Sequence, residues 1–266
     1  MANVENTFLN LGSLRSQMRL TLHTHHAARM WRGRPPKDDV PGIIGLNGFL
    51  AITNKMARYA SQDDPYSDWW LIRIEEKLSD VKARLAEVKE QLEAIYVNVP
   101  AAMSLGENLN LQPANIAIFA NSPLGFLAIF LLAEFDEISR QLVLAHHTAL
   151  IDRNTLDRYL DDCSHHLRSL FTLVQRYRHS EVTREDFAAG NTAASTAIEK
   201  FGEIPADILN GTRRSRFAPP IYRRQESVLG EPSPDHLPDQ PPEPSDADLN
   251  GDPDRYALGN DEPVDQ

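Results

Sequence analysis

Polar and apolar residues alternate near the start of the chain, between Met18 and Thr24. The apolar positions are 18, 20 and 22, and the polar positions between and after them are Arg19, Thr21 and His23. A period of two residues is typical of a half-buried β-strand. A short helical turn from His25 to Trp31 follows, and the sequence Gly-Arg-Pro-Pro at 33–36 ends it.

A heptad pattern dominates the segment after Asp63-Asp64-Pro65, whose residue types favour a helix start. Apolar residues then recur at alternating spacings of three and four: Leu71, Ile74, Leu78, Val81, Leu85, Val88, Leu92 and Ile95. This pattern predicts one long helix with an apolar seam. Basic residues flank the seam and would face each other in a parallel self-pair, so the sequence favours a partner helix within the same chain.

The expected partner is a helix from Leu124 to about Leu150, joined to the first as an antiparallel hairpin. It carries three acidic residues suited to the basic flanks of the seam: Glu134, Asp136 and Glu137. Between the two helices, Asn115 to Ala120 reads as a short strand that can pair with Met18–Thr24. Further helices are expected after Asp152 and from Thr183 to about Gly202.

These elements predict a mainly α protein with a small β element, built as a helical hairpin or bundle. A shorter element precedes them: the three glycines Gly42, Gly45 and Gly48 resemble a phosphate loop in spacing, but no Lys-Ser or Lys-Thr follows. We therefore expect a flexible connector there, which leads into a helix over about Phe49–Ala60.

The last 41 residues have a different composition from the rest. Residues 226–266 contain eight prolines, twelve Asp or Glu and one Arg, with few aliphatic residues. Such a segment cannot bury enough apolar surface to offset the entropy cost of ordering, so we expect a disordered acidic tail. The predicted organisation is a basic N-terminal segment 1–40, a helical body 41–212, an Arg-rich exit segment 213–225 and the tail 226–266.

The net charge of −11 is misleading about partners, because the tail holds all of it. Residues 6–37 contain six Lys or Arg, three His and no acid, and residues 213–224 contain five Arg and no acid. Two basic segments thus flank a more acidic body. They suggest a polyanion partner. The alternative is that these arginines are solvated or pair with the acidic body.

Several classes of protein are disfavoured. Cys163 is the one cysteine, which excludes an intramolecular disulfide and favours a reducing compartment. The longest apolar run, Leu124–Ala133, is 10 residues, shorter than the roughly 20 of a membrane span. The histidine pairs at 146–147 and 165–166 lack the spacing of a metal site. No arrangement of acids or of Cys with His predicts catalysis, so we expect no metal, no cofactor and no enzyme activity.

The first strand suggests chemistry of another kind. Arg19, Thr21 and His23 would project from one face at intervals of about 7 Å. Two such strands paired antiparallel across a homodimer form a ribbon that fits the DNA major groove, as in ribbon-helix-helix repressors. The alternative is a strand whose polar face is merely solvated.

Several segments resemble, in order, a protein family of integrating conjugative elements that is related to the AcaB-like transcriptional regulators of conjugative plasmids. Together they span roughly residues 15–222, and they are residues 18–34, 63–76, 121–126, 132–136, 150–155 and 202–211. The resemblance implies a cytoplasmic protein of conjugative transfer that binds DNA through a ribbon-helix-helix-like strand and controls transfer genes.

Together, the residues and the resemblance predict a DNA-binding regulator or accessory protein, dimeric through its N-terminal strand. Base contacts are expected from the outward face of the strand, and phosphate contacts from the arginines around it and in the exit segment. The predicted phosphate-contacting residues are Arg15, Arg29, Arg32, Arg34, Arg213, Arg214 and Arg216. The alternative is a non-enzymatic scaffold of the transfer machinery, whose acidic tail recruits a basic protein and whose arginines pair with its own body.

Overall fold

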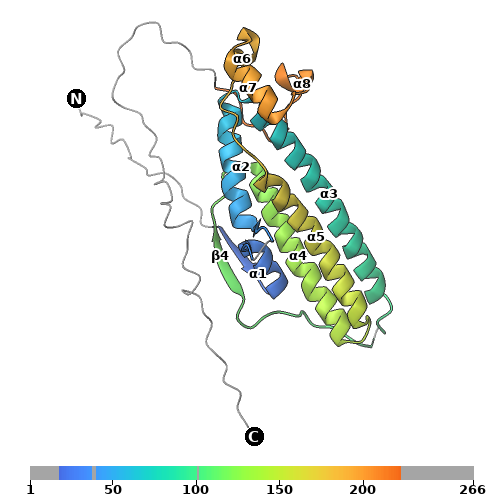
Figure 1. The fold of residues 1–266 in the computed structure, drawn as a ribbon. Helices are drawn as coiled ribbons and strands as arrows, with labels where there is room; N and C mark the ends of the chain where they lie inside the picture. The colour runs from blue at the N-terminus through green and yellow to red at the C-terminus, as the bar shows by residue number, and fades with distance from the viewer. Residues whose placement is uncertain (1–17, 38–39, 101, 223–266) are drawn as a thin grey trace, which may run out of the picture. The chain divides into compact units, whose positions relative to one another are not determined.

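The computed structural model describes residues 18–37, 40–100 and 102–222 (Figure 1). Helices make up most of this part of the chain, and two short antiparallel strand pairs accompany them, which confirms the predicted fold class. The helices are α1 His25–Arg32, α2 Leu46–Ser61, α3 Pro65–Tyr96, α4 Pro123–His147, α5 Arg153–Gln175, α6 Arg184–Ala189, α7 Thr192–Phe201 and α8 Ala206–Leu209. The strands are β1 Met18–Leu22, β2 Gly33–Arg34, β3 Ile43–Ile44 and β4 Ala114–Ile118. The predicted disordered tail lies outside the described residues.

Helix α3 begins where the sequence predicts and buries the predicted seam. The Asp64 carboxylate caps it by accepting hydrogen bonds from the backbone N–H groups of Tyr66 and Ser67, and Pro65 occupies the first turn. The seven seam positions from Leu71 to Leu92 are all buried. The heptad pattern therefore identified the core-facing side of this helix correctly.

The direction of the partner helix differs from the prediction. Tyr96 at the end of α3 donates a hydrogen bond of 2.6 Å to the carbonyl oxygen of Gln141 near the end of α4, so α3 and α4 run parallel (Figure 1). The antiparallel neighbour is α5, since the hydroxyls of Ser67 and Tyr177 lie 2.7 Å apart at the opposite end. The reason is the connection 97–122, which returns along the bundle and includes β4, so α4 starts at the same end as α3.

The sequence also predicts that the basic residues beside the α3 seam pair with acids of α4, and the contacts of Arg84 and Asp136 differ from this prediction. Arg84 of α3 donates to Asp162 of α5 at 2.7 Å and to Glu87 of its own helix at 2.6 Å. Asp136 of α4 is buried and points to the β1–α1 junction instead. The antiparallel helix α5, which the sequence did not pair with α3, thus supplies the acid.

The glycines near residue 42 serve close backbone packing. β2 and β3 pair antiparallel, with Gly33 opposite Ile44. A Cβ atom on Gly45 would lie 2.1 Å from the carbonyl oxygen of Trp31, and one on Gly33 would lie 2.4 Å from the backbone nitrogen of Gly45. Only glycine fits this crossing. The segment is therefore a tight strand pair leading into α2, where the sequence predicts a flexible connector.

The later helices follow their predicted start signals. Asp152 caps α5 by accepting from the N–H of Thr155, and Thr183 forms a capping box with Asp186 at the start of α6. The single helix expected from Thr183 to Gly202 is divided into α6 and α7. The division falls at Gly190, whose left-handed conformation (φ 60°) ends α6.

Candidate nucleic-acid interface

Strands β1 and β4 pair antiparallel, as the sequence suggests, and form a ribbon with two different faces. Leu20, Leu22 and Ile118 are buried on the inner face. On the outer face, Thr21 lies opposite Asn115 and Arg19 opposite Ala117, and all four residues are exposed. The Thr21 hydroxyl donates a 2.9 Å hydrogen bond to Asn115 Oδ1. The strand paired with β1 thus comes from the same chain, and a second ribbon formed with another copy of the chain stays a prediction.

Each strand of the ribbon leads into a pair of helices. β1 is followed by α1 and α2, and β4 by α4 and α5. Helix α1 packs against α2, α4 and α5, and α2 packs against α4 and α5. One chain therefore contains two strand-helix-helix units whose strands pair and whose four helices share a core (Figure 1).

A buried carboxylate fixes the ribbon to this core. Asp136 of α4 is 3% exposed. It accepts hydrogen bonds from the backbone N–H of His23 at 3.0 Å, from the backbone N–H of Thr24 at 2.8 Å and from the Thr24 hydroxyl at 2.7 Å. Thr24 is also the N-cap of α1. Asp136 consequently holds the junction of β1 and α1 in place.

His23 lies just past the end of β1, and its ring and carbonyl oxygen are both engaged in hydrogen bonds within the chain. Its ring Nδ1 accepts a hydrogen bond from the backbone N–H of Asn110, and its carbonyl oxygen accepts one from the Asn110 side chain, both at 3.2 Å. The ring is half-buried. These contacts leave Arg19 and Thr21 as the exposed members of the predicted base-contacting set, and the role of His23 stays a prediction.

Helix α1 presents a basic face beside the ribbon. His25, Arg29 and Arg32 are spaced by four and three residues, which puts them on one side of the helix, and all three are exposed. Within the described residues, no carboxylate forms an ion pair with Arg19, Arg29 or Arg32. Their charges are therefore not neutralised by the body of the protein. Arg34, which is exposed in β2, donates to the carbonyl oxygen of Pro41 at 3.2 Å.

His26 differs from the exposed residues of this helix because it is half-buried. Burial lowers the pKa of His26 below its usual value of 6.5, and the nearby charges of Arg29 and His25 lower it further, while Asp161 and Asp157 of α5 oppose this effect. The ring is thus neutral at pH 7. It adds no charge to the basic face of α1.

Within the described residues, the arginines of the exit segment form ion pairs with acids of α3, unlike those of the basic face of α1. Arg214 makes two hydrogen bonds of 2.8 Å to the carboxylate of Asp68, which is fully buried. Arg213 lies 3.1 Å from Glu76, and Arg216 lies 2.7 Å from Glu75. These contacts fasten the segment to the first turns of α3. Phosphate binding by Arg213, Arg214 and Arg216 stays a prediction, and Arg15 lies outside the described residues.

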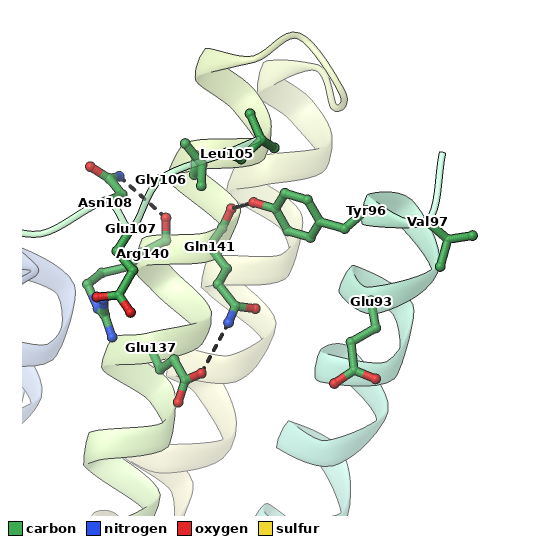
Figure 2. A pocket seen from close by; sticks show the side chains of 11 residues that line it. Glu93, Tyr96, Val97, Leu105, Gly106, Glu107, Asn108, Glu137, Arg140 and Gln141 are labelled. Atoms are coloured by element: carbon green, nitrogen blue, oxygen red, sulfur yellow. Dashed lines mark hydrogen bonds between the residues drawn. The ribbon is translucent and has the colours of Figure 1, made fainter. Parts of the chain in front are cut away.

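A pocket of about 570 Å³ opens where the ends of α3 and α4 meet residues 105–108 (Figure 2). Asn108 donates to the carbonyl oxygen of Arg140 at 3.4 Å, and Arg140 Nε lies 3.8 Å from Asp136. The carboxylates of Glu93, Glu107 and Glu137 line the pocket from three different segments. The contacts shown hold the connection that leads to β4 against α4.

The described residues form neither a metal-binding group nor a membrane-spanning helix. No group of three His, Cys, Asp or Glu side chains there could hold a metal ion. None of the helices in the same part of the chain is long and apolar enough to span a bilayer. Cys163 is buried, and burial raises the pKa of its thiol to about 12, so the thiolate that a nucleophile requires is not formed at neutral pH.

A family model described as the transcriptional regulator AcaB matches residues 10–222. The chain belongs to the AcaB family. A crystal structure of AcaB from uropathogenic E. coli shares its fold, with a TM-score of 0.50 and 14% identity over 74% of this chain and 98% of the other. No curated protein sequence matches the chain. Membership of the AcaB family supports a role in transcriptional regulation.

Asp136 and Asn115 contribute to this candidate site, and the sequence alone does not predict either role. The sequence predicts Asp136 only as one of three acids that face the basic flank of α3, and with Glu134 and Glu137 beside it no local signal distinguishes it as a buried anchor. Asn115 was taken only as part of a strand. Its place opposite Thr21 depends on a pairing across 94 residues.

Proposed function

We propose that the chain is a cytoplasmic DNA-binding transcriptional regulator or accessory protein of an integrating conjugative element. The observation that carries the proposal is the β1–β4 ribbon with its polar outer face, next to arginines that the described part of the body leaves unpaired. Two-stranded ribbons fit the major groove, which is about 12 Å wide. The resemblance to conjugative-element proteins supports the biological setting.

The arrangement favours a ribbon-helix-helix-like mode of binding. In such proteins an antiparallel ribbon enters the groove, and each strand is followed by two helices that form the core beneath it. Here both strand-helix-helix units belong to one chain. A homodimer is then not required to complete one ribbon, and under this proposal it serves to place two ribbons on neighbouring half-sites.

The basic residues divide into two roles. Arg19 and Thr21 on the outer face of β1 contact base edges, with His23 at the end of the strand. Arg29 and Arg32 on the exposed face of α1 contact phosphates on the flank of the groove, and Arg34 extends this set. Phosphate contacts position the protein and carry no sequence information, so loss of the two kinds of contact has different consequences.

The test is binding of the purified full chain to a duplex from the promoter region of its own element and to a scrambled duplex. We expect tighter binding to the promoter duplex. Arg19→Ala should reduce the ratio of the two affinities, by roughly tenfold, because an arginine–guanine pair contributes about 1–3 kcal/mol to discrimination. Equal binding of wild-type protein to both duplexes would contradict a role as a sequence-specific regulator.

A second candidate function is a scaffold that binds another protein of the transfer machinery. It is favoured by the pairing of Arg213, Arg214 and Arg216 with acids of α3, which this alternative requires. Its remaining feature is a basic protein bound by the acidic residues 226–266. A chain ending at residue 225 would then lose the complex, and the full chain would show no salt-dependent binding to duplex DNA.

A further inference from the structure

The outer face of the β1–β4 ribbon is asymmetric. Two identical strands paired antiparallel would present the same residue pairs in both directions, related by a two-fold axis. This ribbon instead carries Thr21 opposite Asn115 at one end and Arg19 opposite Ala117 at the other. No operation that exchanges the two strands maps these side chains onto one another. A single chain thus presents chemically different ends to a bound duplex.

Asn115 is equipped to read a base at its end of the ribbon. Its Oδ1 accepts the Thr21 hydroxyl at 2.9 Å, which orients the amide and leaves a second lone pair on the oxygen. The contact of its Nδ2 with the carbonyl oxygen of Pro113 is long, at 3.5 Å. The residue is exposed. An asparagine amide matches the N6 donor and N7 acceptor of adenine in the major groove.

The other end has different chemistry. Ala117 is small and exposed opposite Arg19, so it leaves room for the guanidinium to approach a base edge. Arginine pairs with the O6 and N7 acceptors of guanine, and an alanine methyl group can contact the methyl group of thymine. The two ends of the ribbon therefore favour different base pairs.

We infer that Asn115 is a specificity-determining residue that reads an adenine, and that one chain recognises a non-palindromic DNA element. This inference rests on the proposed function, since it assumes that the ribbon enters the major groove. Besides its own contact with a base edge, Thr21 orients the Asn115 amide through its hydroxyl. Arg19 reads a base pair on the opposite side of the element.

The experiment is selection of bound sequences from a random duplex pool, with the full-length wild-type chain and Asn115→Asp. The substitution keeps an acceptor for the Thr21 hydroxyl but removes the amide donor, so the ribbon hydrogen bond is retained. We expect a non-palindromic wild-type element with one adenine whose preference falls at least tenfold in the variant. A carboxylate accepts from the N4 amino group of cytosine, so cytosine should gain at that position.

Asn98→Asp makes the same change at an exposed asparagine just past the end of α3 and is the matched control, which should select the wild-type element. Thermal unfolding of the variants checks that their folds are intact. The inference would be overturned if the element contacted by one chain had a palindromic core. It would also be overturned if folded Asn115→Asp kept the wild-type preference for adenine. Either result would leave DNA binding itself in place. Failure of the wild-type chain to enrich any sequence would overturn the proposed function as well.

Discussion

Asp136 ties the ribbon to the helices through hydrogen bonds. Its buried carboxylate serves three donors of His23 and Thr24, and each buried donor left without a partner costs about 1–3 kcal/mol. We predict that Asp136→Ala lowers the free energy of unfolding by about 3 kcal/mol or more, measured by urea denaturation. Any variant protein that remains folded should also bind DNA more weakly, because the β1–α1 junction has lost its anchor.

Glu134 offers a matched control on the same helix. It is half-buried two residues earlier, and the described structure gives its side chain no hydrogen bond. Its replacement by Ala should change stability by less than about 0.5 kcal/mol. Equal stability losses in the two variants would show that Asp136 does not have the anchoring role.

His26 makes stability depend on pH. Its folded-state pKa lies below the usual 6.5, chiefly through burial, so the unfolded chain binds the proton more tightly. The free energy of unfolding should therefore fall as pH drops below about 6.5 toward the folded-state pKa. We predict a smaller loss of thermal stability between about pH 7 and about pH 5.5 in His26→Gln than in wild type. The same substitution at the exposed His165 is the control for the loss of a histidine from the chain.

Single residues on the ribbon could be predicted only when the local pattern defined them. The alternation from Met18 to Thr24 was enough to place Arg19 and Thr21 outside and Leu20 inside. The roles of Asp136 and Asn115 depend on partners 112 and 94 residues away, and no local period contains that information. Long-range hydrogen bonds are therefore where the sequence interpretation was incomplete.

At the scale of elements, the exit segment is fastened to α3 by a buried pair. Arg214 contacts Asp68, which also accepts from Arg184 of α6. We predict that Arg214→Ala lowers the free energy of unfolding by about 2 kcal/mol, less than the roughly 3–5 kcal/mol for a fully orphaned buried charge, because Arg184 remains. Denaturant unfolding measures this loss.

Arg213 provides the comparison, since it lies in the same segment but is 54% exposed where it meets Glu76. Solvent screens exposed pairs, so Arg213→Ala should cost less than about 1 kcal/mol. A larger loss for Arg213→Ala than for Arg214→Ala would contradict the assignment of Asp68 as the attachment point.

The heptad pattern predicted the buried side of α3 but not the direction of its neighbours. Burial depends on which positions are apolar, and Leu71 to Leu92 satisfy that requirement against a parallel or an antiparallel helix alike. Direction depends on the connection, and the 97–122 segment is long enough to return along the bundle. The complementary charges of α3 and α4 favoured the wrong neighbour, because the acid that pairs with Arg84 is Asp162 of α5.

At the scale of the whole molecule, two strand-helix-helix units in one chain form a complete ribbon over a shared core. The sequence predicted a mainly helical protein and the pairing of the two strands, because each element has its own periodicity. It assigned the partner strand for DNA binding to a second copy, since strand patterns alone do not distinguish pairing within a chain from pairing between chains. Membership of the AcaB family agrees with the regulatory role proposed for this arrangement.

The central claim is that the face formed by the ribbon and α1 contacts DNA, and its most direct test is the salt dependence of DNA affinity. The measurement compares wild-type protein, Arg32→Ala and a control, Lys82→Ala, which removes an exposed charge from α3. Loss of one phosphate contact should reduce the slope of log affinity against log salt concentration by about 0.9 in Arg32→Ala, with no change in Lys82→Ala. An unchanged slope in Arg32→Ala, or the larger change in Lys82→Ala, would contradict the account.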